Sequence, residues 1–140
     1  VFVTPSRKGG CKVSIGNFEY SKVSEGEGAS NSNATLMVSD YAQNVQNDPY
    51  AADEIKRIEE SLLTNPDWEQ VDVYSAAKIS LYIFFGNADE KNLDSQLEAL
   101  RDNMSEEFYS VTRDIIKNAY PTRPTLKEYL KVIEAEMLKF

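Results

Sequence analysis

A segment near the middle of the chain, VYSAAKISLYIFF at residues 73–85, restricts most strongly how this 140-residue sequence can fold. Its composition suits a helix, yet apolar side chains fall on nearly every side of that helix. Such a helix has no polar face to turn to water, so other elements must surround it. Its longest apolar run, Leu81 to Phe85, is far shorter than the ~20 residues that cross a bilayer. The segment therefore predicts a central buried helix.

Two helical patterns precede this segment. Residues 35–46 have the apolar spacing of a moderate helix. Asp48-Pro49 then predicts a helix start, with Asp as the N-cap and Pro at the first helical position. This second helix should run to about Leu63. Its apolar stripe consists of Ile55, Ile58 and Leu62.

Three more helical patterns follow the central segment. Residues 89–103 repeat leucine at helical spacing, and Ser105 predicts the N-cap of the next helix. The apolar face of that next helix should be Phe108, Val111, Ile115 and Ala119. Thr125 and Glu128 form a capping box that opens the last helix. The last helix should bury Leu126, Leu130, Ile133 and Met137. Together these patterns predict a mainly α fold, a compact bundle of about six helices.

The first 23 residues differ from the rest in both period and charge. They carry four basic residues and one acidic residue, a balance of +3, whereas the remainder carries 11 basic and 22 acidic residues, a balance of −11. Apolar residues alternate on either side of Gly16-Asn17, which predicts a β-hairpin with a two-residue turn. Phe2 and Val3 are available as a third strand. The face of this N-terminal hairpin would consist of Val13, Ile15, Phe18 and Tyr20.

The hairpin and the helices are separated by residues 24–33, SEGEGASNSN, which contain no large apolar side chain. This composition is typical of a flexible linker. The sequence therefore predicts a basic β-hairpin segment at 1–23, a linker at 24–33 and an acidic helical domain at 34–140. The linker is either native or a joint made in cloning.

The composition argues against most catalytic chemistries. The chain has no histidine and one cysteine, Cys11, which removes Ser-His-Asp catalysis and thiolate zinc sites. It also lacks phosphate-binding loops and EF-hand loops. A pair of carboxylates acting as acid and base is the remaining catalytic option. We therefore expect no enzyme activity, no metal and no cofactor.

Several residues are candidates for binding a partner. A lone hairpin is marginal in water, so its apolar face should pack against something. Trp68 either anchors a partner or closes the edge of the core. Tyr82, Phe84 and Phe85 cannot share one helix face, so either a contact surface lies there or the central helix is covered on all sides. The partner-binding candidates are Val13, Ile15, Phe18, Tyr20, Trp68, Tyr82 and Phe85.

A basic loop at the N-terminus is a candidate for binding anions. Arg7, Lys8 and Lys12 surround the pair Gly9-Gly10, whose backbone amides are free to approach a phosphate. The alternative is a flexible surface loop that joins two strands.

Residues 1–22, VFVTPSRKGGCKVSIGNFEYSK, resemble the opening of a FLYWCH-type zinc finger. The matching positions are Phe2, Val13, Phe18 and Tyr20. The second cysteine and the HxH pair of that family are missing, and Cys11 is not at a ligand position, so no zinc ligand carries over. The resemblance implies a hairpin from a chromatin-associated or nucleic-acid-associated protein.

These observations favour a non-catalytic protein–protein interaction module, an adaptor or a regulatory protein. Its partner is another protein, with a second copy of the chain as one option. The first alternative is a chromatin or nucleic-acid-associated protein that uses the basic hairpin, and the second is a carboxylate-based hydrolase. The single cysteine and the lack of a signal peptide favour an intracellular location, cytoplasmic or nuclear, and no membrane partner.

Overall fold

The computed structural model describes four stretches of the chain, residues 2–5, 9–14, 47–56 and 68–139. The helix predicted at 35–46 and the linker lie outside them. The chain divides into two units, Val1–Met37 and Val38–Phe140. The prediction of a mainly helical chain with an N-terminal β-hairpin is confirmed.

The first unit contains a two-stranded antiparallel hairpin. Strand β1 (Phe2–Pro5) pairs with β2 (Cys11–Ser14), and Val3 lies opposite Val13. The strands that pair thus include the segment expected only as a third strand, and the predicted turn at Gly16-Asn17 lies outside the described residues. Gly9 and Gly10 follow β1 with φ of 86° and 80°, a backbone conformation that glycine adopts without steric cost.

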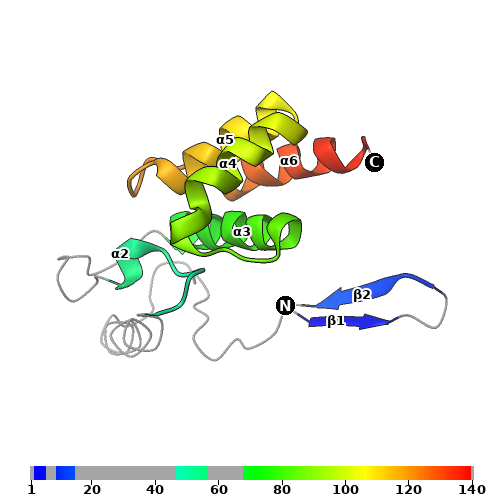
Figure 1. Cartoon of the computed structure of the whole chain (residues 1–140). Helices are drawn as coiled ribbons and strands as arrows, with labels where there is room; N and C mark the ends of the chain where they lie inside the picture. Colours follow the sequence, from blue (N-terminus) through cyan, green and yellow to red (C-terminus); the bar gives the residue numbers. More distant parts are fainter. Residues whose placement is uncertain (1, 6–8, 15–46, 57–67, 140) are drawn as a thin grey trace, which may run out of the picture. The chain divides into compact units, whose positions relative to one another are not determined.

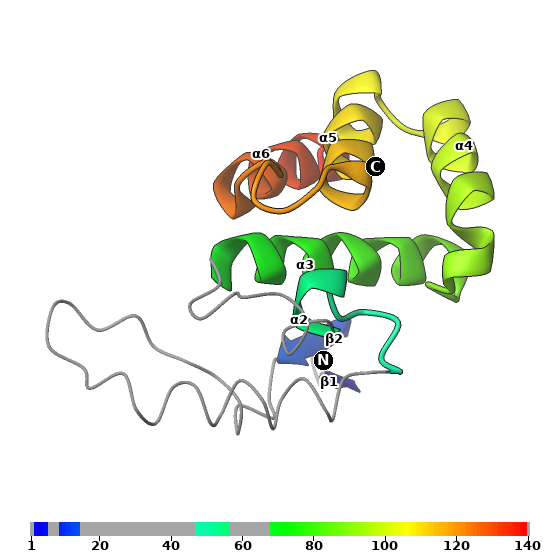
Figure 2. The same ribbon diagram turned by 90° about the vertical axis from the view of Figure 1, so that its left-hand side faces the viewer.

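The second unit is helical (Figure 1). Its described elements are α2 (Asp53–Lys56), α3 (Trp68–Phe85), the 3-10 turn η1 (Glu90–Asn92), α4 (Leu93–Asn103), α5 (Glu106–Lys117) and α6 (Leu126–Met137). Figure 2 shows α3 passing beneath α5 and α6, with α4 closing one end of the group. This places α3 at the centre, as its composition predicts.

Local capping signals fix the ends of these helices. The Ser105 side chain accepts a hydrogen bond from the backbone N–H of Phe108, and Thr125 and Glu128 form the predicted capping box. Gly86, with a φ of 73°, ends α3 in the left-handed conformation that suits a helix C-terminus. The predicted boundaries in this half of the chain are therefore confirmed to within a few residues.

The predicted helix start at Asp48-Pro49 is wrong. The carboxylate of Asp48 accepts a hydrogen bond from the N–H of Tyr50 at 2.8 Å, and its carbonyl oxygen accepts one from Ala51. Asp48 therefore closes a turn rather than capping a helix, because an Asp side chain can satisfy either geometry. The helix begins only at Asp53.

The core lies between α3 and the helices around it. Val73, Ala77 and Leu81 of α3 are fully buried, as are Phe108 and Ile115 of α5. Further fully buried residues are Ile55, Leu100 and Tyr129. The face predicted for α5 is confirmed at Phe108 and Ile115, whereas Val111 is only half-buried. Helix α5 stops at Lys117, so Ala119 lies beyond the helix and is exposed.

The core assignment leads to a stability prediction. Leu81→Ala should lower the free energy of unfolding by about 2–5 kcal/mol, because it removes a fully buried side chain and leaves a cavity. Ile79→Ala should cost less, since Ile79 is half-buried. Glu98→Ala on the exposed side of α4 serves as the control and should change stability by less than about 0.5 kcal/mol. Urea unfolding of the three variants measures the order, and a larger effect at Ile79 than at Leu81 would contradict the assignment.

Candidate interaction surface

Helix α6 does not bury the stripe that its spacing predicts. Leu126, Leu130 and Met137 are 42%, 53% and 69% exposed, and Ile133 is half-buried. The buried residues are instead Tyr129, Val132 and Glu136. The prediction for α6 is therefore wrong by a rotation of about one residue, and an apolar stripe of this helix faces outward.

Packing contacts at the buried stripe explain this rotation. The ring of Tyr129 stacks on that of Phe108 with 6.2 Å between the centroids. The Glu136 carboxylate lies at the start of α5. It accepts a hydrogen bond from the backbone N–H of Ser105 at 3.1 Å and another from the Ser105 hydroxyl. Burial of an aromatic ring and a carboxylate that binds the start of α5 together hold this stripe inward.

The Glu136 carboxylate is kept ionised by these neighbours. Hydrogen bonds from Lys139 and then from Ser105 lower the pKa of Glu136 below its ordinary value. Its negative charge lies at the N-terminus of α5, where the helix dipole favours an anion. Glu136 thus ties the C-terminal end of α6 to α5.

Helix α3 carries a matching stripe next to its contact with α6. Glu69 reaches α6, where it accepts a hydrogen bond from the N–H of Leu126 at 3.2 Å. Farther along α3, the Ser80 hydroxyl lies close enough to Tyr129 to oppose the rise in the pKa of Tyr129 that burial causes. Asp72, Ala76, Ile79 and Ile83 are spaced by four, three and four residues and lie beside this contact line.

The two stripes lie on neighbouring helices, and we treat them together as the α3–α6 face. Ile83 is 72% exposed on it. Glu69 meets Leu126 near the starts of both helices, and Phe84 at the end of α3 meets Phe108 at the start of α5, so α3 and α6 run in the same general direction. The face consists of Asp72, Ala76, Ile79 and Ile83 with Leu126, Leu130, Ile133 and Met137.

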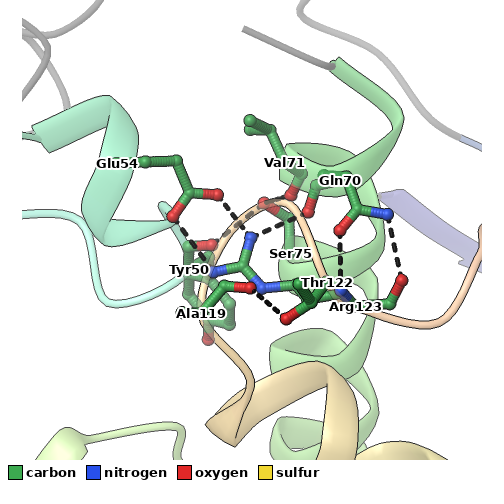
Figure 3. A network of polar contacts seen from close by, with 8 residues as sticks. All are labelled: Tyr50, Glu54, Gln70, Val71, Ser75, Ala119, Thr122 and Arg123. Carbon is green, nitrogen blue, oxygen red and sulfur yellow. Dashed lines mark hydrogen bonds and ion pairs between the residues drawn. The ribbon is translucent and has the colours of Figure 1, made fainter. Parts of the chain in front are cut away.

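The start of α6 is held against α3 by a network around Arg123 (Figure 3). The backbone N–H of Arg123 donates to the side-chain oxygen of Gln70 at 2.9 Å, and the Gln70 amide donates back to the Arg123 carbonyl at 3.1 Å. The Arg123 guanidinium donates to the carbonyl oxygen of Gln70 and forms a two-pronged ion pair with Glu54 of α2. It also lies 4.8 Å from the ring centroid of Tyr74.

This network is almost closed to water. The side chains of Arg123 and Glu54 are 5% and 8% exposed. Burial, followed by nearby carboxylates, raises the pKa of Tyr74 to about 12, so its ring stays neutral beneath the guanidinium. The loop between α5 and α6 is thereby fixed to α3 and α2 at once.

Loss of one partner from this pair should be severe. Arg123→Ala should lower the free energy of unfolding by about 3–5 kcal/mol, because it leaves the Glu54 carboxylate buried without its cation. Arg101→Ala, which removes an exposed arginine, is the matched control and should cost less than about 1 kcal/mol. Chemical unfolding measures both. A double variant, Arg123→Met with Glu54→Leu, should recover part of the loss, and a double variant no more stable than Arg123→Ala would contradict the account.

The central helix is not covered on all sides, contrary to the simpler interpretation of its sequence. Tyr82 is exposed and meets Tyr50 edge-on at 6.2 Å between centroids. Phe84, also exposed, meets Phe108 at 5.9 Å, whereas Phe85 is half-buried against the core. Trp68 is likewise half-buried and packs on the core, which is the position of a core-edge residue. Sequence reasoning missed the exposed Ile83 altogether.

The candidates on the hairpin are placed only in part. Val13 is 59% exposed, and Lys12 and Cys11 are exposed as well. The other hairpin candidates lie outside the described residues: Arg7, Lys8, Ile15, Phe18 and Tyr20.

Lys78 is an unusual residue of the core. Its side chain is fully buried, and within the described part of the chain its ammonium nitrogen has no hydrogen-bond partner. Burial lowers the pKa of Lys78, as does the charge of Lys56, while Glu90 and two aspartates nearby act in the opposite direction. Lys78 therefore weakens the fold whenever it is charged.

Replacing this lysine should stabilise the protein. Lys78→Met should raise the free energy of unfolding by about 1–3 kcal/mol at neutral pH, because it removes a buried polar group without a partner and keeps a similar shape. The gain should shrink as the pH rises through 10.5, the ordinary pKa of lysine, since the amine then loses its proton in the unfolded state as well.

The matched control is Lys91→Met, which changes an exposed lysine and should have little effect. Thermal unfolding of the three proteins at neutral and alkaline pH provides the measurement. A Lys78→Met variant less stable than the parent chain would show that the amine has a favourable partner.

The described residues contain no cluster of three or more His, Cys, Asp or Glu side chains that could hold a metal ion. Described residues line two cavities that are open to solvent. One, of about 450 Å³, lies between the turn at Asn47 and η1, and the other, of about 350 Å³, lies beside Arg123. Among the helices of the described stretches, none has both the length and the apolar character needed to cross a bilayer.

Comparison with known proteins adds no family to these observations. No family model, curated protein or solved structure matches the chain.

Proposed function

We propose that this chain is a non-catalytic protein–protein interaction module, an adaptor or a regulatory protein, whose partner docks on the α3–α6 face. The observation that carries the proposal is the outward apolar stripe of α6, above all Leu130 and Met137. Isolated apolar residues are common on protein surfaces, but a contiguous stripe over three turns of a helix marks a contact site.

The surroundings of this stripe have the character of an interface. Lys127, Lys131 and Glu134 are exposed along its outer edge. An apolar centre with a charged rim is the usual arrangement where proteins meet. Both ends of α6 are tied down, by Arg123 at the start and Glu136 at the end, so the stripe is presented without a large ordering cost.

The buried carboxylates support a non-catalytic role. Glu54 is engaged by the Arg123 guanidinium, and Glu136 by Ser105 and Lys139. A carboxylate pair that acts as acid and base needs two such groups facing a shared space. These two lie instead at opposite ends of α6, each committed to a structural partner.

Site-specific photo-crosslinking tests the proposal. A photoreactive amino acid at position 130 should capture a protein in the cells from which the sequence derives, because that position lies at the centre of the α3–α6 face. The same amino acid at Glu98, on the exposed side of α4, is the control and should capture nothing.

A third position, Lys12, tests the alternative role in nucleic-acid binding. No adduct at position 130, together with a nuclease-sensitive adduct at position 12 that vanishes steeply with salt, would overturn the proposal in favour of a nucleic-acid-associated protein.

A further inference from the structure

We infer that the partner on the α3–α6 face is a second copy of this chain, an inference that rests on the proposed function. The two copies pack face to face about a two-fold axis parallel to the helices, so that α3 of each copy lies against α6 of the other. In this arrangement Asp72 of one copy pairs with Lys127 and Lys131 of its partner.

The register of α3 and α6 supports this pairing. The hydrogen bond between Glu69 and Leu126 sets the starts of the two helices at the same level. Asp72 is three residues beyond Glu69, while Lys127 and Lys131 are one and five residues beyond Leu126. At a rise of about 1.5 Å per residue, the aspartate lies between the levels of the two lysines.

The charges on the two edges of the face are opposite in sign. The α3 edge carries Asp72, and the α6 edge carries Lys127, Lys131 and Glu134, a balance of +1, with all four side chains exposed. The ion pairs of the described residues include none of these four. A parallel two-fold axis brings each acidic edge onto a basic edge, and does so twice, because every contact in such an interface is repeated.

The surroundings of Asp72 agree with this. Burial among its neighbours raises the pKa of Asp72, although its side chain reaches the surface. A carboxylate that is partly shielded from water gains more from an added cation than a fully hydrated one. A lysine of the second copy would supply that cation.

The overall charge makes this local complementarity necessary. The chain carries a net charge of −8, so two copies repel each other in general. Burial of an apolar stripe alone would have to overcome that repulsion. The ion pairs between Asp72 of one copy and the lysines of the other add a local attraction at the contact.

The first test is the mass of the purified full-length chain by sedimentation equilibrium. The parent chain should form a concentration-dependent dimer, and Leu130→Glu should leave it monomeric, because it places a carboxylate at the centre of the interface. Leu130 is half-exposed in the single copy, so circular dichroism and the melting temperature of the monomer should change little. Lys91→Glu, at an exposed site on η1, is the control and should leave the dimer intact.

Charge reversal separates this docking mode from other contacts. Asp72→Lys alone, and Lys131→Asp alone, should each weaken the dimer about tenfold, since each reversal affects two symmetric pairs. The two reversals combined in one chain should recover part of the lost affinity, because the contact between positions 72 and 131 is re-formed with the signs exchanged while Lys127 keeps its charge.

Two results would overturn the inference. A parent chain that stays monomeric up to its solubility limit excludes the second copy, and if position 130 still captures another protein, the proposed function stands without it. A dimer that is insensitive to Leu130→Glu, or a combined reversal that binds no more tightly than either reversal alone, indicates a different surface.

Discussion

The buried pair of Arg123 and Glu54 is the contact on which the rest of this structure depends. It joins α2 to the loop between α5 and α6, and through Gln70 it fastens that loop to the first turn of α3. A buried ion pair is weak evidence for stability, because desolvation offsets the attraction. Here it determines arrangement: the start of α6 can occupy only the place that the guanidinium and the Gln70 amide allow. The direction of α6 along α3 follows from this anchor.

Which face of α6 turns inward is then decided at its other end. The stripes at 125, 129, 132, 136 and at 126, 130, 133, 137 have the same helical spacing, and both contain apolar residues. With the start fixed, the Glu136 carboxylate reaches the amide end of α5 and Tyr129 stacks on Phe108. These contacts outweigh the free energy that burial of Leu126, Leu130 and Met137 would contribute.

The helix ends and the inward face of α6 differ in whether they could be predicted from the sequence. The helix starts at Ser105 and Thr125 were predicted because a cap depends on residues three or four apart. The inward face of α6 could not be predicted in this way, because its contacts are distant in sequence. Ser105 is 31 positions from Glu136, and Gln70 is 53 positions from Arg123. The helix start predicted at Asp48 was wrong for a different reason. An aspartate side chain can cap a helix or close a turn, and the conformation of the following residues determines which of the two forms.

The exposed stripe is therefore a consequence of the anchors rather than an accident of composition. If α6 were free to turn, burying Leu130 and Met137 would gain apolar area at the expense of the two anchored ends. The buried polar contacts at Arg123 and Glu136 hold these apolar side chains outward. They are stable because each buried polar group there has a hydrogen-bond partner. Covering the stripe from outside removes its exposure without breaking either anchor. A partner docked on this stripe, as we propose, would therefore relieve an unfavourable exposure that the fold itself leaves in place.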